Sequence, residues 1–225
     1  MSRVSIIVPA YNEAPILDKT LSQLVAAFPE EELILVSDGS SDATQEVAAR
    51  LAPAVTYLTY QPNHGKGYAI RTGMLAAGGD LLVFTDADLP FGVEGVKCVL
   101  AELRAPDGCD IAIAEKIRLR RGRAYRAARW GVRLIIRAFN GLRMPDTQAG
   151  LKGFTRPAAR RIFTRTRINR FAADIEMLYL AQREGLRIAS VPMEVRKDPR
   201  PSTFNAKQGF YLILDIWRIR FHAYR

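Results

Sequence analysis

Two aspartates, Asp86 and Asp88, stand two positions apart in the segment VFTDADLP, where an apolar run ends. Residues two apart on an extended chain point to the same side, and a turn there can direct both carboxylates toward one cation. Hard oxygen ligands suit Mg²⁺ or Mn²⁺, which proteins commonly hold with one or two carboxylates and substrate phosphates. The segment therefore predicts a divalent metal site, although an isolated pair of this kind is more often an acidic turn.

Two further polar segments carry candidate functional groups. SDGSSD places Asp38 at the last position of an apolar run, and Ser41 or Asp42 where it could simply cap a helix. NHGKGYAIRTGM puts Lys66 between two glycines at a predicted helix start, where exposed backbone N–H groups and a cation could meet a phosphate. Taken alone, each segment is also compatible with ordinary turn or helix-entry chemistry.

The elements that must position these groups alternate along the chain. Strands are predicted at residues 4–10, 32–38, 54–60, 80–86, 109–115 and 186–195, and helices at 14–28, 41–52, 171–185 and 206–225. Continuous apolar runs suit strands buried on both faces, so the pattern predicts an α/β fold: a doubly wound, mostly parallel sheet with helices on both faces. In such sheets ligands bind beyond the carboxyl ends of the strands, which is where the polar segments fall.

The composition is that of a globular protein that favours anionic partners. Of 225 residues, 33 are Lys or Arg and 23 are Asp or Glu, which gives a formal net charge of +10. Nucleic acid, anionic lipid and phosphorylated small molecules are therefore favoured electrostatically. Two cysteines, no signal-peptide pattern and no apolar run of about 20 residues predict a reducing, cytoplasmic location without a membrane span.

One segment, residues 116–143, is both basic and aromatic, with ten Lys and Arg residues interleaved with apolar side chains. This pattern favours a basic amphipathic helix lying in the plane of an anionic membrane surface. A solvated helix that packs one face on the core is the alternative. The terminal helical pattern, residues 206–225, also ends in basic and aromatic residues, and we expect both segments to dock on a membrane.

Six segments occur in the order and spacing of family 2 glycosyltransferases: SIIVPAYNE, VSDGSSDAT, NHGKGYAIRTGM, TDADLP, DTQAGLKGFTR and FAADIEMLYLA. The chain most resembles the branch that makes dolichyl-phosphate glucose or mannose and its bacterial polyprenyl-phosphate relatives. The resemblance covers residues 5 to about 196 and implies a GT-A fold, a nucleotide-sugar donor and inversion at the anomeric carbon. We expect one domain over residues 1–225, with a nucleotide-sugar-binding half (1–115) and an acceptor half (116–225).

The resemblance assigns residues to the donor. Pro9, Tyr11 and Glu13 match positions that hold the nucleoside. Asp38 is expected nearby on the base or ribose, and Lys66 matches a lysine that lines the same pocket. The acidic pair of VFTDADLP matches the family pair that binds the divalent ion and, through it, the donor diphosphate.

The resemblance also assigns residues to the reaction and the acceptor. Lys116 sits where an arginine usually follows the fifth strand, and Arg129 or Arg133 falls where a second arginine for the acceptor phosphate is expected. Asp146 and Gln148 match a segment near the donor sugar and acceptor. Glu176 matches a family acid close to the site, with a buried structural carboxylate paired to an arginine as the alternative.

Two departures from the family pattern concern the phosphate and metal contacts. The expected GSR reads Ala114, Glu115 and Lys116, which replaces a planar bidentate contact by a point charge. Pro90 stands where mannosyl-transferring relatives can supply a glutamine to the metal. We therefore expect Asp86 and Asp88 to hold the ion together with donor oxygens and water.

These expectations combine into a metal-dependent hexosyltransferase. It would move glucose from UDP-glucose, the DTQ-G form favouring this donor over GDP-mannose, to a polyprenyl phosphate, as a peripheral protein on the cytoplasmic face of the membrane. An ionised phosphate acceptor needs no general base. A saccharide or hydroxylated acceptor is the alternative, with Asp174 or Glu176 as base. A non-catalytic binder also stays open, whereas only the charge suggests a nucleic-acid module, and we expect no nucleic-acid partner.

Overall fold

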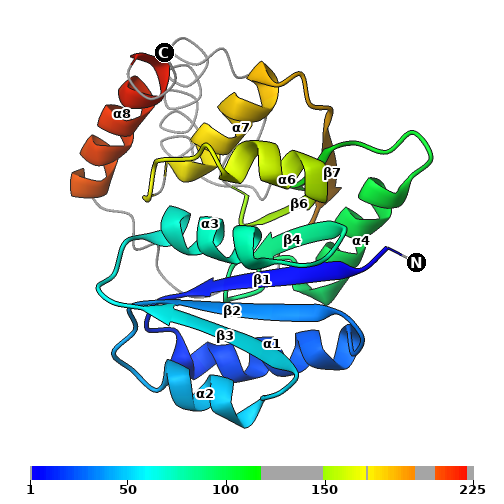
Figure 1. Ribbon diagram of the computed structural model, residues 1–225, viewed down its shortest axis with the longest axis vertical. Helices are drawn as coiled ribbons and strands as arrows, with labels where there is room; N and C mark the ends of the chain where they lie inside the picture. Colours follow the sequence, from blue (N-terminus) through cyan, green and yellow to red (C-terminus); the bar gives the residue numbers. More distant parts are fainter. Residues whose placement is uncertain (1, 118–148, 171, 196–205, 222–225) are drawn as a thin grey trace.

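The computed structural model describes residues 2–117, 149–170, 172–195 and 206–221. In this part of the chain seven strands form one sheet in the order β3-β2-β1-β4-β6-β5-β7 (Figure 1). The strands are β1 (Val4–Ala10), β2 (Glu32–Asp38), β3 (Val55–Tyr60), β4 (Leu81–Thr85), β5 (Ile111–Lys116), β6 (Leu151–Thr155) and β7 (Ile188–Met193). β6 runs antiparallel to both of its neighbours, and the other pairs are parallel. The predicted mostly parallel sheet is confirmed.

Helices cover both faces of the sheet. One face carries α1 (Ala14–Ala27), α2 (Thr44–Arg50) and α4 (Gly92–Arg104). The other carries α3 (Lys66–Ala76), α6 (Arg156–Phe163), α7 (Ala173–Arg183) and α8 (Ala206–Phe221). Figure 1 shows α1 and α2 below the sheet and α3, α6 and α7 above it. This doubly wound arrangement is the predicted fold class.

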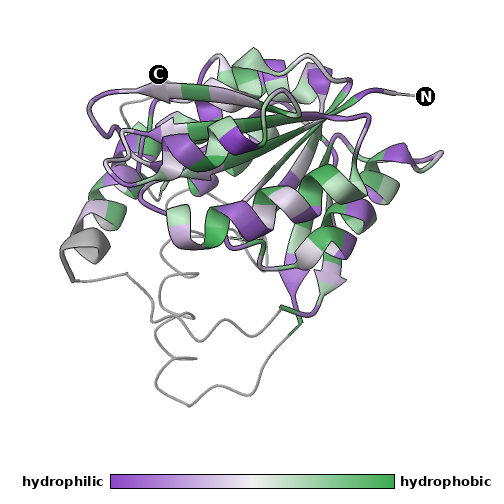
Figure 2. Ribbon diagram, turned by 90° about the horizontal axis from the view of Figure 1, so that it is seen from below, coloured by the Kyte–Doolittle hydropathy of each residue, from purple (hydrophilic) through white to green (hydrophobic). Residues whose placement is uncertain are grey.

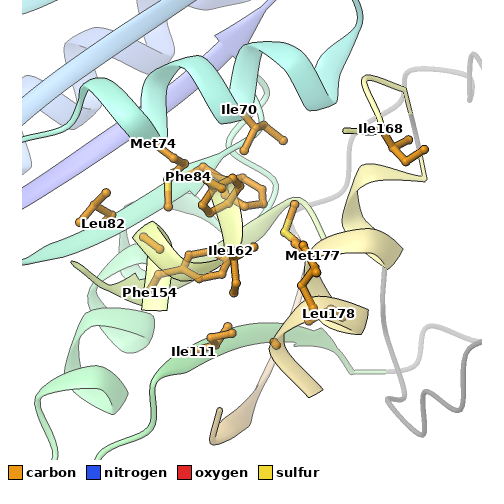
Figure 3. Packing of buried hydrophobic residues seen from close by; sticks show 14 of the residues in the cluster. Ile70, Met74, Leu82, Phe84, Ile111, Phe154, Ile162, Ile168, Met177 and Leu178 are labelled. Atoms are coloured by element: carbon orange, nitrogen blue, oxygen red, sulfur yellow. The ribbon is translucent and has the colours of Figure 1, made fainter. Parts of the chain in front are cut away.

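Alternation along the buried strands divides their side chains between two cores. In β1, Ile7 belongs to the core that also contains α3 and α7, whereas Ile6 and Val8 belong to the core that contains α1 and α4. Figure 3 shows the first core, in which Phe84 and Phe154 stack with ring centroids 6.2 Å apart. Fully burying a large apolar side chain contributes roughly 1.5–3 kcal/mol. Both cores therefore anchor the central strands, which are green in Figure 2.

Three described elements were not predicted from the sequence: α4, β6 and α6. β6 reads LKGFT, a run that lysine and glycine interrupt. Gly153 lies under α4, since a Cβ there would stand 2.5 Å from Val99 Cγ1. α6 follows directly, and Thr155 caps it by accepting a hydrogen bond from the backbone N–H of Ala158 (3.4 Å). Close packing of β6, rather than an apolar run, decides its place in the sheet.

Candidate active site

The carboxyl ends of the parallel strands meet at one edge of the sheet. β2, β1 and β4 are adjacent. Asp38 is the last residue of β2, and the segments after β1 and β4 hold Tyr11 and the pair Asp86 and Asp88. β5 runs in the same direction two strands beyond β4, about 10 Å away. Its last residue, Lys116, is exposed at the same edge. The sequence-predicted donor and acceptor residues that the structure describes therefore share one side of the molecule.

An ion pair between Lys66 and Asp86 lies at this edge. Lys66 Nζ is 2.6 Å from Asp86 Oδ1, and each side chain is 31% exposed. Burial of the ammonium would lower its pKa, but the surrounding carboxylates, first Asp86 and then Asp174, raise the pKa of Lys66 above its usual range. Asp88 adds to the same negative environment and is itself exposed. Lys66 is therefore protonated and positively charged, with carboxylates around it.

Gly150 supports Asp86 from another side. The backbone N–H of Asp86 donates to the Gly150 carbonyl (2.9 Å), which extends the pairing of β4 with β6. A Cβ on Gly150 would lie 2.1 Å from Asp86 Oδ2. Only glycine lets the acidic loop sit this close to the start of β6. The glycine-spaced segment and the acidic pair thus form one structural unit.

Asp38 organises the loop before α3. It is 3% exposed, and its carboxylate accepts hydrogen bonds from the backbone N–H groups of His64 and Gly65, both at 2.8 Å. Burial and then the charge of Asp38 raise the pKa of the neighbouring Tyr60 hydroxyl. Asp38 therefore has a clear structural role besides the expected contact with the base or ribose, which stays a prediction.

The two glycines around Lys66 permit close packing rather than an open phosphate cradle. A Cβ on Gly65 would lie 2.5 Å from the Asn169 carbonyl oxygen, and one on Gly67 would lie 2.4 Å from Ala173 Cβ. The Gly67 N–H donates to the Asn169 carbonyl (2.8 Å). The expectation of exposed amides at this helix start is wrong for Gly65 and Gly67, because Asp38 and Asn169 already accept their hydrogen bonds. The side chain of Lys66 is what this segment presents to a ligand.

Asn12 and Asp42 join the loops after β1 and β2. Asn12, at φ 54°, accepts a hydrogen bond from the Ser41 N–H (2.8 Å). Asp42 accepts from the N–H groups of Ala14 (3.0 Å) and Thr44 (3.1 Å). Partial burial opposes ionisation of Asp42, but a hydrogen bond from the Thr44 hydroxyl (2.5 Å) and the two backbone hydrogen bonds together outweigh it and lower its pKa. Asp42 thus serves the starts of both α1 and α2, beyond the single helix cap expected from the sequence.

The predicted nucleoside residues flank these joined loops. Pro9 is buried inside β1, paired in register with Val36. Tyr11 follows it and is 50% exposed, while Glu13 is half-buried just before α1. Tyr11 is therefore the large side chain of this set that a ligand could reach directly.

Lys152 is a buried charge that the sequence patterns did not single out. It is 0% exposed, and its Nζ donates to Asp174 Oδ1 (2.5 Å) and to the Ala149 carbonyl (2.6 Å). It also lies 5.3 Å from the centre of the Phe84 ring. A lysine between apolar residues was a signal in the sequence for a buried charge. Its partner, Asp174, could not be predicted, because it lies on a helix that is distant in the sequence. The pair ties the start of β6 to α7.

Glu176 is also buried, with 0% exposure. Its carboxylate accepts hydrogen bonds from the N–H groups of Arg167 (2.9 Å) and Ile168 (3.0 and 3.1 Å). The carboxylate therefore binds backbone amides of the α6–α7 loop, in addition to any arginine contact expected from the sequence. Four other predicted residues, Arg129, Arg133, Asp146 and Gln148, lie outside the described residues.

The acidic pair fits a divalent ion only with help from a ligand. In the parts of the chain that the structure describes, no group of three or more His, Cys, Asp and Glu side chains could hold a metal. Asp86 Oδ1 is buried and is bound by the Lys66 ammonium group, whose Nζ lies 2.6 Å away. Mg²⁺ and Mn²⁺ are commonly coordinated by one or two carboxylates together with phosphate oxygens and water, and this ligand set is possible at Asp86 and Asp88.

The sheet order and the helices on both faces are those of the GT-A fold. Glucosyl-3-phosphoglycerate synthase from Mycobacterium tuberculosis, solved with Mn²⁺, UDP-glucose and phosphoglyceric acid, is similar with a TM-score of 0.73 at 19% identity. The match covers 97% of this chain and 79% of that one. At this identity the likeness supports the fold alone.

The chain belongs to glycosyl transferase family 2, whose family model matches residues 5–167. It is 36% identical over 214 residues to dolichyl-phosphate beta-glucosyltransferase of Drosophila melanogaster, which covers 84% of this chain and 65% of the relative. The human dolichyl-phosphate beta-glucosyltransferase is 32% identical over 216 residues, covering 84% and 66%. The chain thus spans about two thirds of the length of these relatives. The expected family is confirmed.

Proposed function

We propose that this protein is a metal-dependent, inverting transferase that moves glucose from UDP-glucose to a dolichyl or other polyprenyl phosphate. The observation that carries the proposal is the 36% identity to a dolichyl-phosphate beta-glucosyltransferase over 84% of the chain. The site supports it, because an acidic pair and a lysine lie together at the ligand-binding edge of the sheet. GDP-mannose is the second choice of donor.

In this proposal the residues of the acidic edge bind the donor diphosphate. Asp86 and Asp88 would hold Mg²⁺ or Mn²⁺, which would neutralise charge on the departing nucleoside diphosphate. Lys66 would add a positive charge to the same phosphates. Pro9, Tyr11, Glu13 and Asp38 would line the nucleoside side of the pocket.

In the proposed reaction the acceptor phosphate is the nucleophile, and no general base is required. An oxygen of the acceptor phosphate attacks the anomeric carbon from the side opposite UDP, and the carbon–oxygen bond to UDP breaks with its electron pair passing to the β-phosphate. The configuration at the anomeric carbon is thereby inverted. The acceptor oxygen is already ionised at neutral pH, so no side chain has to remove a proton.

The contacts of Asp174 and Glu176 favour the phosphate acceptor over a hydroxyl acceptor. A hydroxyl would require a general base, and these two carboxylates are the candidates. Asp174 is paired with Lys152, and Glu176 binds two backbone amides. Both therefore have structural tasks, and we assign neither to proton abstraction.

The acceptor phosphate would be bound by basic residues of the second half. Lys116 stands exposed at the end of β5, on the same edge as the acidic pair. Arg129 or Arg133 would supply the planar bidentate contact that a lysine cannot make. Asp146 and Gln148 would lie near the donor sugar.

We further propose that the protein works as a peripheral protein on the cytoplasmic face of the membrane. No helix within the described ranges is long and apolar enough to cross a bilayer. α8 buries Leu212, Ile216 and Ile219 against the core and exposes Trp217 and Arg220. An outward aromatic and basic face suits a membrane interface, whereas the apolar stripe of this helix is core.

A panel of labelled nucleotide sugars tests the proposal. The purified protein is incubated with each donor, a short polyprenyl phosphate and Mn²⁺, and the organic phase is extracted. We expect label from UDP-glucose in that phase, reduced about 100-fold or more in Asp88→Asn, on the scale of losing a group that stabilises transition-state charge. Full activity of Asp88→Asn would contradict the metal assignment.

A further inference from the structure

The contact between Lys66 and Asp86 blocks part of the carboxylate on which the proposed metal site depends. Asp86 Oδ1 is buried, and its partner is the Lys66 ammonium group, whose Nζ lies 2.6 Å from it. An ammonium group at this distance occupies the space that a divalent ion would need to ligate the same oxygen, because metal–oxygen bonds are about 2.0–2.2 Å long. A cation can therefore take the position of Nζ beside Oδ1 only if Lys66 moves.

Of the two partners, Lys66 is the one that can move. Asp86 is held by its backbone hydrogen bond to Gly150, where an added Cβ would stand 2.1 Å from Asp86 Oδ2. The backbone at Lys66 is also fixed, because both flanking glycines are hydrogen-bonded to neighbouring segments. The lysine side chain, in contrast, has a flexible four-carbon stem and is 31% exposed. Its ammonium can swing away while its backbone stays in place.

The negative surroundings give Lys66 a reason to stay until another charge arrives. Asp86, Asp174 and Asp88 all act on its ammonium group. A divalent ion at Asp86 would repel the ammonium, whereas a diphosphate beside the ion would offer it a new, strongly charged partner. A metal ion that binds alone therefore breaks the contact between Lys66 and Asp86 and gives the ammonium group no new partner. A metal ion that binds together with the nucleotide provides the diphosphate as that partner.

From this geometry we propose that Lys66 is an internal counter-cation of Asp86 that couples metal binding to donor binding. It neutralises Asp86 when no donor is bound, and it transfers to the diphosphate when the ion binds. By linkage, the nucleotide tightens the metal and the metal tightens the nucleotide by the same factor. This inference rests on the proposed function, since it takes the ligand to be a metal–nucleoside diphosphate.

The test is direct Mn²⁺ binding to the full chain, measured by the electron paramagnetic resonance signal of free Mn²⁺ with and without UDP. In Lys66→Met we expect Mn²⁺ to bind roughly tenfold more tightly without UDP, and the tightening by UDP to shrink, within the usual range of coupling factors. Lys66→Gln is a second neutral variant should the first fold poorly. Lys66→Arg keeps the charge and should keep most of the coupling.

Two controls separate this effect from a general change in charge. Lys97→Met removes an exposed lysine of α4 that pairs with Glu94, and should bind Mn²⁺ as the unmodified protein does. Asp88→Asn should lose Mn²⁺ binding with UDP, which identifies the site. Near-ultraviolet circular dichroism verifies that each variant is folded.

The outcomes distinguish the inference from the function on which it rests. If the folded neutral variants bind Mn²⁺ no more tightly than the unmodified protein without UDP, while UDP still tightens Mn²⁺ normally, the role of Lys66 is wrong and the proposed function stands. If the unmodified protein fails to bind Mn²⁺ even with UDP, both the metal assignment and the role of Lys66 are contradicted.

Discussion

The Asp86 carboxylate contacts two residues that are remote in the sequence. Lys66 contacts one of its oxygens and Gly150 lies against the other. The residue types and the strand-end position of Asp86 and Asp88 led us to predict a ligand site, which stays a prediction. Their contacts were not predictable, because α3 and β6 reach the acidic loop only through the fold of the sheet. An acidic turn would need neither neighbour.

The buried pair of Lys152 and Asp174 is the strongest single-residue case for a structural charge. Lys152→Met should destabilise the protein by about 3–5 kcal/mol, because it leaves Asp174 buried and unpaired. Denaturant unfolding monitored by circular dichroism measures the loss. The double variant Lys152→Met with Asp174→Leu should recover most of it, since an apolar pair leaves no isolated charge.

Lys97→Met is the matched control for that measurement. Its ammonium group is exposed and pairs only across one helical turn, so the substitution should change stability by less than about 1 kcal/mol. A Lys152→Met variant as stable as this control would show that the buried pair does not hold β6 to α7.

At the scale of elements, the loop between α6 and α7 connects three helices. Glu176 of α7 holds the backbone amides of Arg167 and Ile168. Arg71 of α3 donates to the Thr166 carbonyl (2.9 Å) and to Asn169 Oδ1 (3.1 Å). The Asn169 carbonyl in turn accepts from Gly67, beside Lys66. α7 therefore helps to position the backbone next to Lys66, the lysine that we propose binds the donor, through this loop.

The variant Glu176→Gln tests that chain of contacts. Its amide group has one oxygen in place of two and can turn an N–H toward the loop donors, so we expect a loss of about 1–3 kcal/mol in stability. UDP affinity in the presence of Mn²⁺ should fall with it. Isothermal titration and unfolding measure the two effects, and the exposed Glu194→Gln serves as control.

A different outcome would restore a catalytic role. If Glu176→Gln kept both its stability and its UDP affinity but lost turnover, Glu176 would act on the substrate rather than on the loop. Glucose transfer to a polyprenyl phosphate, followed under saturating UDP-glucose, provides that comparison.

The first strands were predictable because each is a continuous apolar run. The observed bounds of β1 and β2 are the predicted residues 4–10 and 32–38. Each of the other predicted strands differs from the observed strand by no more than two residues at either end. β6 was not predictable in this way, because Lys152 and Gly153 interrupt its apolar run. The lysine is satisfied by Asp174 and the glycine by α4, and both partners are contacts across the fold.

At the scale of the whole molecule, strands of both sequence halves complete one sheet. β6 from the second half is inserted between β4 and β5 of the first, and β7 extends the sheet beyond β5. This places Lys116 on the same edge as the acidic pair. The formal net charge of +10 favours the binding of anionic ligands to the protein. Donor and acceptor chemistry can therefore meet at one edge.

The central claim is glucose transfer from UDP-glucose to a polyprenyl phosphate. The most direct measurement compares a short polyprenyl phosphate with the matching polyprenol as acceptors, with labelled UDP-glucose and Mn²⁺, and identifies the lipid product by mass spectrometry. We predict a glucosyl phosphate lipid from the phosphate and no lipid product from the alcohol, because a hydroxyl needs a general base and the candidate carboxylates of Asp174 and Glu176 already bind Lys152 and the α6–α7 loop. Equal transfer to the alcohol, or label only in water-soluble products, would contradict the account.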